Sequence, residues 1–310
     1  MGGRVAVRGK VAAVTGAGSG IGRALVVELA RRDARVSGCD TDAEGLAATA
    51  ALVPGMHTAV VDVSQRAAMF AYAEAVRSHF GVVHQVYNNA GIAFSQPVAE
   101  SSWEDYERVF RVNLNGVIHG TQAFLPHLVA SGDGHVVNLS SLNGVLAQAG
   151  MSHYCTAKFA VRGFTETLAL ELRRDGLPVA ASVVHPGGVG TAIADNAMRL
   201  AQAAGHQVGP THDRNRHLYN EKVLRMDPAK AARIIVDGVE AGRPRILVGG
   251  DAILADALVR LAPARVGDVT LWLERRLARS VEPTGRAAPV ADVTAGSTQG
   301  PIPSQQGDRR

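Results

Sequence analysis

The sequence has few cysteines and no long hydrophobic run among its 310 residues. Its two cysteines, Cys39 and Cys155, stand far apart and match no metal-binding or redox spacing, which argues against a disulfide-stapled or zinc-stabilised protein. The apolar stretch at residues 11–14 is too short for a secretory signal, and no run reaches the roughly 18 residues of a membrane-spanning helix. We therefore expect a cytoplasmic protein with reduced thiols.

Lysine is also rare, and the net charge is small. Only four lysines occur, so arginine supplies most of the positive side chains behind the net charge of +4. No basic stripe or aromatic platform accompanies this charge, and nucleic-acid binding is not expected. With 46% hydrophobic residues the chain can bury a sizeable core, which excludes wholesale disorder.

Seven short apolar runs alternate with segments of helical periodicity. The runs lie at residues 10–15, 35–40, 57–61, 83–87, 135–139, 178–184 and 245–248. Strands and helices that alternate in this way form right-handed crossovers between parallel strands. We therefore expect an α/β fold with a doubly wound, seven-stranded parallel sheet of Rossmann type. Ser64 is expected to cap the helix that ends near residue 81.

The motif-bearing part of the chain predicts one catalytic domain at residues 5–250. Within it, the glycine-rich and polar residues at about 187–225 indicate an irregular substrate lid. Residues 251–280 are predicted to form a helical extension. Residues 281–310 contain prolines, glycines and polar residues without periodicity, which predicts a disordered tail.

The helical extension carries several arginines beside leucines. Contact with a membrane surface is therefore one interpretation. Because Asp256, Asp268 and Glu274 dilute the positive charge, we favour packing over the pocket or at an oligomer contact.

A glycine-rich turn at residues 15–22, TGAGSGIG, joins the first strand to the first helix. Such a turn lets the backbone approach a pyrophosphate at the positive end of the helix. Asp40 ends the next strand, where a carboxylate would bond the ribose hydroxyls of NAD and repel the 2′-phosphate of NADP. We therefore favour NAD over NADP; the alternative is a structural turn with an unrelated acid. The candidate cofactor-binding residues in the turn are Gly16, Ser19, Gly20, Ile21 and Gly22.

Two further loops follow predicted strands. Asp62 and Val63 follow the third strand, and Asn89, Ala90 and Gly91 follow the fourth. Ligands of open parallel sheets bind beyond the carboxyl ends of the strands. These residues are thus also cofactor-binding candidates, although each alone could be an ordinary loop start.

Tyr154 and Lys158 stand four residues apart in a helical pattern, so their side chains share one helix face. A free phenol has a pKa of about 10, too high for a base near neutral pH. A neighbouring ammonium favours the phenolate, which would suit Tyr154 to acid/base catalysis. The alternative is a surface pair without a catalytic role.

Ser141 follows the fifth strand and precedes Tyr154 by 13 residues. Its hydroxyl could hold the substrate oxygen, with Ser140 as the alternative for that role. Asn113 lies in a predicted helix, where asparagine is unfavourable. It could bind a water that connects Lys158 to solvent, or it could serve as a helix cap.

Together these elements resemble the short-chain dehydrogenase/reductase family. The matching elements are TGxxxGxG at 15–22, Asp40, Asp62, NNAG at 88–91, Asn113, Ser141, YxxxK at 154–158 and Pro186-Gly187. The resemblance implies a catalytic set of Asn113, Ser141, Tyr154 and Lys158, with Lys158 and Tyr154 also contacting the cofactor. It further implies that Pro186, Gly187, Val189 and Thr191 bind the nicotinamide end.

Within the family, three stretches look closest to bacterial alkyl or medium-to-long-chain secondary alcohol dehydrogenases. They are FLPHL at 124–128, AKFAVRGFTE at 157–166 and HPGGV at 185–189. The resemblance also implies a homodimer or homotetramer.

The residues expected around the active centre are mostly apolar. They are Ile92, Phe94, Leu142, Val145, Leu146, Met151, Ile193 and Met198. We therefore predict an oxidoreductase that interconverts a hydrophobic secondary alcohol and its ketone, with no metal ion. Two alternatives stay open: these side chains could simply pack the lid onto the core, and the protein could be a catalytically idle dinucleotide sensor or scaffold.

Overall fold

The computed structural model describes residues 7–191 and 225–279 of the chain. Its seven strands are β1 (Val11–Thr15), β2 (Arg35–Asp40), β3 (His57–Val60), β4 (Gln85–Asn88), β5 (Gly134–Leu139), β6 (Val179–Pro186) and β7 (Arg245–Val248). They form one parallel sheet in the order β3-β2-β1-β4-β5-β6-β7. The predicted doubly wound, seven-stranded sheet is confirmed, and its strand order reverses between β1 and β4.

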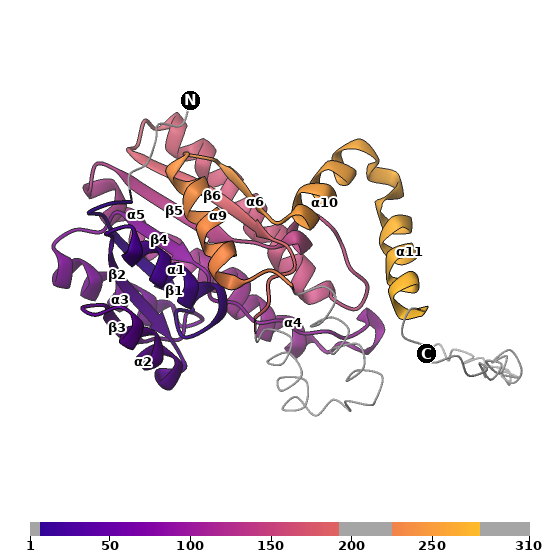
Figure 1. Ribbon diagram of the computed structural model, residues 1–310, viewed down its shortest axis with the longest axis horizontal. Coiled ribbons are helices and arrows are strands. Elements are labelled where there is room, and N and C mark those ends of the chain that lie inside the picture. The colour runs from indigo at the N-terminus through magenta and orange to yellow at the C-terminus, as the bar shows by residue number, and fades with distance from the viewer. Residues whose placement is uncertain (1–6, 192–224, 280–310) are drawn as a thin grey trace, which may run out of the picture. The chain divides into compact units, whose positions relative to one another are not determined.

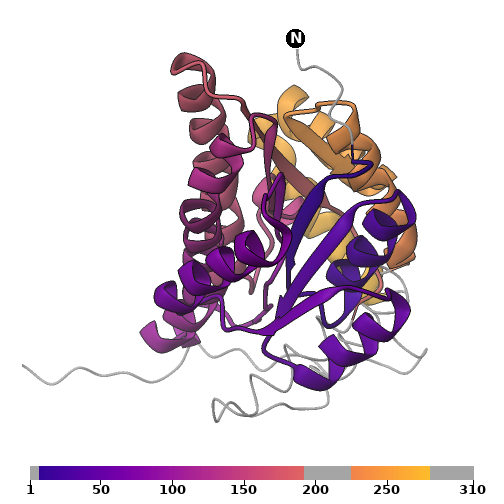
Figure 2. The same ribbon diagram turned by 90° about the vertical axis from the view of Figure 1, so that its left-hand side faces the viewer.

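Helices cover both faces of the sheet (Figure 1). One face carries α1 (Gly20–Arg31), α2 (Ala43–Leu52) and α9 (Pro228–Glu240), and the other carries α3 (Arg66–Phe80), α5 (Gly116–Ala130) and α6 (Ser152–Arg174). In Figure 2 the orange α9 and the magenta α6 stand on opposite sides of the sheet. This is the arrangement that right-handed crossovers produce on both sides of a parallel sheet.

The strands are apolar on both sides because both sides are covered. In β1, Ala12 and Val14 join the core cluster beneath α1 and α9, whereas Val11 and Ala13 join the cluster beneath α3 and α5. All four side chains are fully buried. Two-sided burial explains why the strands appear in the sequence as near-continuous apolar runs rather than as alternating ones.

The start of α3 differs from the sequence prediction. The helix begins at Arg66, and Gln65 occupies the N-cap position without a side-chain capping bond. The backbone N–H of Ser64 donates to Oδ1 of Asp62 at 2.9 Å. The Asp62 carboxylate therefore holds the turn before the helix, and the prediction that Ser64 caps α3 is wrong.

The predicted helical extension consists of two helices, α10 (Gly250–Leu261) and α11 (Val266–Arg279). Pro263 separates them, because proline lacks a backbone N–H and clashes with the preceding turn of a helix. Buried Asp256 of α10 forms ion pairs with Arg245 of β7 at 2.7 Å and with Arg260 at 2.9 Å. This pairing attaches α10 to the edge of the sheet.

The chain divides into two compact units, residues 1–267 and 268–310. The first contains the sheet and α10. In the second, the Arg276 guanidinium lies 5.2 Å from the centre of the Trp272 ring. Most of the predicted lid and all of the predicted tail fall outside the described residues. None of the helices in the described ranges is long and apolar enough to span a bilayer.

Candidate active site

The loops after β1 and β4 are joined at the carboxyl edge of the sheet. The Thr15 hydroxyl oxygen accepts hydrogen bonds from the backbone N–H groups of Asn89 and Ala90, both at 3.0 Å. The Asn89 side-chain amide donates to the carbonyl oxygens of Thr15 at 2.9 Å and Gly16 at 3.2 Å. These bonds bring two of the predicted cofactor segments into direct contact.

Gly16 and Gly22 make this contact possible. Gly16 has a φ of +67°, and a Cβ there would lie 2.8 Å from the Cα of Ala90. A Cβ at Gly22 would overlap the carbonyl oxygen of Gly16 and approach the Asn89 side-chain nitrogen to 2.6 Å. The two glycines therefore serve packing between loops as well as any approach to a pyrophosphate, a requirement that the motif alone did not reveal.

The N-terminus of α1 opens onto the same edge. Ser19 is the N-cap residue; it is exposed, and its side chain makes no capping hydrogen bond. Ile21 in the first turn is partly buried against the core beneath α1 and α9. A Cβ at Gly20 would lie 3.1 Å from the methyl carbon of Thr191, so the two predicted segments are neighbours. The free N–H groups of a first helical turn provide a site for a phosphate.

Asp40 is held at the end of β2 by backbone donors. Its Oδ2 accepts from the N–H of Gly18 at 2.8 Å, and its Oδ1 accepts from the N–H of Asp42 at 3.0 Å. A Cβ at Gly18 would lie 2.9 Å from Oδ2 of Asp40. The carboxylate is thus fixed beside the glycine-rich turn, as a ribose-binding acid requires.

Arg23, which was not predicted as a site residue, supports the turn from the other side. Its guanidinium donates to the carbonyl oxygen of Gly18, to that of Gly45 at 3.2 Å and to the hydroxyl of Thr49 at 2.9 Å. These bonds tie the glycine-rich turn to α2. An arginine directly after the last glycine of the motif was the available signal, but two of its three partners, Gly45 and Thr49, lie more than 20 residues away.

Asp62 and Val63 differ in their exposure. Asp62 is exposed at the edge of the sheet, and its carboxylate holds the turn before α3. Val63 is buried, and its carbonyl oxygen lies 3.0 Å from Nδ1 of His119 on α5. Of these two residues, only Asp62 therefore offers its side chain to solvent.

Tyr154 and Lys158 lie together on α6. The Lys158 ammonium nitrogen is 5.7 Å from the centre of the Tyr154 ring and donates to the carbonyl oxygen of Leu139 at 2.9 Å. Lys158 is buried, and burial lowers its pKa from the ordinary 10.5 to about 8. The structure thus places a buried cation beside a half-buried phenol at the end of β5.

The two serines after β5 have different surroundings. The Ser140 hydroxyl is buried and donates to the carbonyl oxygen of Lys158 at 2.8 Å, which attaches β5 to α6. The Ser141 hydroxyl accepts from the N–H of Asn143 at 3.1 Å and can still donate. This difference favours Ser141 over Ser140 as the group that could hold a substrate oxygen.

His185 fixes the backbone of Ser141 from β6. Its Nδ1 lies 2.8 Å from the carbonyl oxygen of Ser141, and burial lowers the pKa of His185 to about 4. The imidazole is therefore neutral near pH 7, and the carbonyl partner places its proton on Nδ1. His185 could not be predicted from the sequence because its partner lies 44 positions away.

Asn113 lies in a π-helical turn, Arg111–Asn115, that joins α4 (Trp103–Phe110) to α5. Helices α4 and α5 (Gly116–Ala130) therefore run on from one another through this turn. The buried Asn113 side chain accepts from the N–H of Ile92 and donates to its carbonyl oxygen, both at 2.8 Å, so Asn113 is not a helix cap. A methyl group at Gly91 would lie 3.4 Å from Oδ1 of Asn113 and 3.6 Å from Nζ of Lys158, so these side chains converge.

The apolar residues predicted around the active centre fall into three groups. Phe94 and Val145 are buried, and Phe94 packs in a small cluster with Val109 and Ala157. The partly exposed group comprises Ile92, Leu142, Leu146 and Met151. Ile193 and Met198 lie outside the described residues.

The turn after β6 approaches the same edge. The N–H of Gly187 donates to the carbonyl oxygen of Val248 at 2.9 Å, and Val189 is buried in a parallel bridge with Met226. The backbone bonds between Gly188 and Met226 at 3.0 Å and between Gly190 and Met226 at 2.8 Å complete this bridge. The segment from Pro186 to Thr191 is thus anchored on the C-terminal part of the chain.

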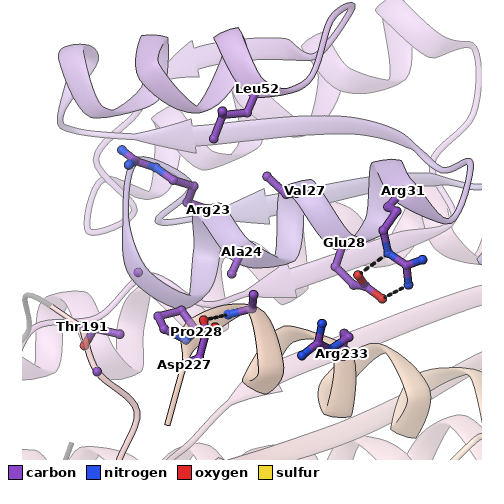
Figure 3. A pocket seen from close by; sticks show the side chains of 13 residues that line it. Arg23, Ala24, Val27, Glu28, Arg31, Leu52, Thr191, Asp227, Pro228 and Arg233 are labelled. Carbon is purple, nitrogen blue, oxygen red and sulfur yellow. Dashed lines mark hydrogen bonds and ion pairs between the residues drawn. The ribbon is translucent and has the colours of Figure 1, made fainter. Parts of the chain in front are cut away.

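A cavity of about 730 Å³ lies on the outer side of α1 (Figure 3). Residues of α1, the end of α2 and the start of α9 line it, and it reaches the cofactor edge at Gly20 and Thr191. Asp227 there caps α9 by accepting from the N–H of Ala229 at 2.8 Å. None of the four predicted catalytic residues is among the residues that line the cavity. It adjoins the candidate active site without containing it.

Several known proteins are similar to this chain. The sequence profile described as short chain dehydrogenase matches residues 10–200. SadH of Mycobacterium tuberculosis, named provisionally as an oxidoreductase, is 47% identical over 257 residues, which cover 82% of this chain and 91% of SadH. Levodione reductase of Leifsonia aquatica is 34% identical over 228 residues, covering 71% of this chain and 81% of the reductase. The crystal structure of a short chain dehydrogenase/reductase from Burkholderia phymatum in complex with NAD matches with a TM-score of 0.76 at 32% identity, covering 92% of this chain and 99% of that one.

Proposed function

Because the chain belongs to the short-chain dehydrogenase family of oxidoreductases, we propose that it interconverts a hydrophobic secondary alcohol and its ketone, using NAD. The observation that carries this proposal is the buried Lys158 ammonium, 5.7 Å from the ring of Tyr154 at the carboxyl edge of the sheet. A pure binding protein has no need of a buried cation beside a phenol, since burying a charge is costly.

The residues at this edge fit a dinucleotide. The first turn of α1 offers backbone N–H groups to a pyrophosphate, and Ser19 adds an exposed hydroxyl. Asp40 provides a fixed carboxylate for the ribose hydroxyls, with Asp62 and the residues of the 88–91 turn nearby. NAD would supply the acceptor for the hydride that leaves the alcohol carbon. The relative from Burkholderia phymatum, in complex with NAD, supports this choice.

In the proposed reaction Tyr154 removes the proton of the substrate hydroxyl and returns it when the ketone is reduced. Ser141 would hold the substrate oxygen through its remaining hydroxyl proton. Lys158 favours the phenolate form of the neighbouring ring by its charge. Asn113 fixes Ile92 beside Gly91 and thereby shapes the wall next to Lys158.

The substrate is proposed to be apolar because Ile92, Leu142, Leu146 and Met151 are partly exposed beside the active centre. Apolar side chains around a few polar groups are typical of pockets for hydrophobic ligands. Buried Phe94 and Val145 would support this wall from behind. We further propose that the protein acts in the cytoplasm as a homodimer or homotetramer. The free, buried thiols of Cys39 and Cys155 agree with a reducing compartment.

Secondary alcohols of graded chain length test this function. We expect NAD reduction, followed by its absorbance, with kcat/KM rising by about three- to tenfold for each added methylene group until the pocket is filled. Small polyols and hydroxy acids serve as polar controls of similar reactivity. Preference for these controls would contradict the apolar pocket. Tight NAD binding without turnover of any alcohol or ketone would favour the alternative, an idle dinucleotide sensor.

The choice of cofactor depends on the charge of Asp40. Asp40→Asn keeps one acceptor oxygen, loses one of the two backbone hydrogen bonds that hold the carboxylate, and removes the charge that repels a 2′-phosphate. We expect the ratio of kcat/KM with NAD to that with NADP to fall by about 10- to 100-fold. Asp42→Asn is the matched control, since Asp42 caps α2 by accepting from the N–H of Gly45. An equal change in both variants would refute a specific role for Asp40.

A further inference from the structure

The carboxylate of Asp251, in the first turn of α10, is bonded to the turn that follows β6. Its Oδ2 accepts from the backbone N–H of Gly188 at 2.6 Å, across 63 positions of sequence. Asp251 is an exposed residue that neither the family motifs nor the catalytic set includes. Acidic side chains are common in the first turn of a helix, where the helix dipole attracts them.

Two glycines leave the space that this carboxylate occupies. A Cβ on Gly187 would overlap both carboxylate oxygens of Asp251, and a Cβ on Gly249 would overlap Oδ1. Gly249 also has a φ of +112°, which other residues rarely adopt. The chain thus omits side chains at two positions where the Asp251 carboxylate meets the backbone.

The Asp251 end of this hydrogen bond is held in place by the sheet. Strand β7 pairs with β6 up to Val248, and α10 begins two residues later. Asp256, five residues further along α10, is buried in its ion pair with Arg245. The position of Asp251 is therefore fixed by the sheet. Its hydrogen bond to Gly188 in turn fixes the backbone of the Gly187–Val189 turn.

From this geometry we propose that Asp251 is a positioning residue that holds the Gly187–Val189 turn in place for the nicotinamide end of NAD. The inference rests on the proposed function and adds to it that α10, outside the predicted catalytic domain, takes part in cofactor binding. Asp251 acts through the backbone N–H of Gly188 and touches no reacting atom. Its effect is confined to the nicotinamide half, because the glycine-rich turn and Asp40 hold the adenosine half independently.

Calorimetric binding of NAD and of ADP-ribose, which lacks the nicotinamide, tests this inference. For Asp251→Ala we expect about tenfold weaker NAD binding and less than a twofold change with ADP-ribose. Asp251→Asn should recover most of the NAD affinity, because its amide oxygen can still accept from Gly188. Asp268→Ala, at the corresponding first turn of α11, is the matched control and should leave both affinities unchanged.

Four outcomes would overturn the proposal. Equal weakening of NAD and ADP-ribose would indicate a general structural role, and unchanged NAD binding would indicate none. An Asp251→Asn variant as weak as Asp251→Ala would assign the effect to charge instead of the hydrogen bond. If the wild-type chain bound neither ligand, the proposed function itself would fail, and this inference with it. Thermal unfolding of each variant is the control that the measured affinities refer to folded proteins.

Discussion

Tyr154→Phe is expected to lower kcat by about 10³-fold while leaving the affinity for NAD within about twofold. The substitution removes one oxygen atom and keeps the ring that faces Lys158. Without the hydroxyl no group at this position can take the proton of the alcohol, so the loss falls on the chemical step. Steady-state rates of NAD reduction and equilibrium binding of NAD measure the two quantities separately.

Tyr106→Phe is the matched control for this experiment. The Tyr106 hydroxyl bonds the Ser152 hydroxyl at 2.7 Å, at the start of the same helix α6. Removing it perturbs α6 without touching the proposed proton path, so kcat should stay within about threefold of wild type. Near-normal turnover in Tyr154→Phe would refute the proposed acid/base role.

Lys158→Met is expected to lower kcat by about 10³-fold or more. The same substitution is expected to stabilise the fold. Burial lowers the pKa of Lys158 to about 8, so the protonated form is costly in the folded state. Methionine has a similar length and no charge. At pH 7 the free energy of unfolding should rise by up to about 3 kcal/mol, less the loss of the bond to Leu139.

The pH dependence distinguishes this effect from simple repacking. Between pH 8 and 10.5 the unfolded chain holds one more proton than the folded one, so the stability of the wild type increases with pH there. The difference in free energy of unfolding between Lys158→Met and the wild type should therefore be largest below about pH 8 and disappear towards pH 10.5. Denaturant unfolding at several pH values measures this difference.

Lys10→Met is the control for the loss of a lysine. Lys10 pairs with Asp133 at 2.7 Å near the surface, and its replacement should cost at most about 1 kcal/mol without the same pH profile. A Lys158→Met variant less stable than wild type at pH 7 would show that the buried ammonium is favourable in the fold.

The strands were predictable because each is buried on both faces. Residues 35–40 and 245–248 match β2 and β7 at both ends, and the other predicted strands differ from the structure by a few residues. Turns were less predictable, since their hydrogen bonds depend on single side chains. Ser64 fits a capping pattern, but the helix starts at Arg66, so the N-cap position falls on Gln65 instead.

The candidate site was predictable where one short motif carries it. Tyr154 and Lys158 meet because helical spacing alone brings them together. The groups that hold the site in place were not predictable, because Arg23, His185 and Asp251 act on partners distant in sequence. Asn113 is intermediate: its unusual place in a helix was visible, but the π-helical turn and the bonds to Ile92 emerge only in three dimensions.

The bond between Gly187 and Val248 has a consequence for synthesis of the chain. The glycine-rich turn leaves the ribosome early, but the turn after β6 gains its backbone partner only when β7 emerges, more than 220 residues later. A nascent chain that ends before β7 contains the glycine-rich turn and Asp40 but lacks the strand that holds the turn after β6. Cofactor can therefore stabilise the protein fully only once nearly all of the first unit has been made.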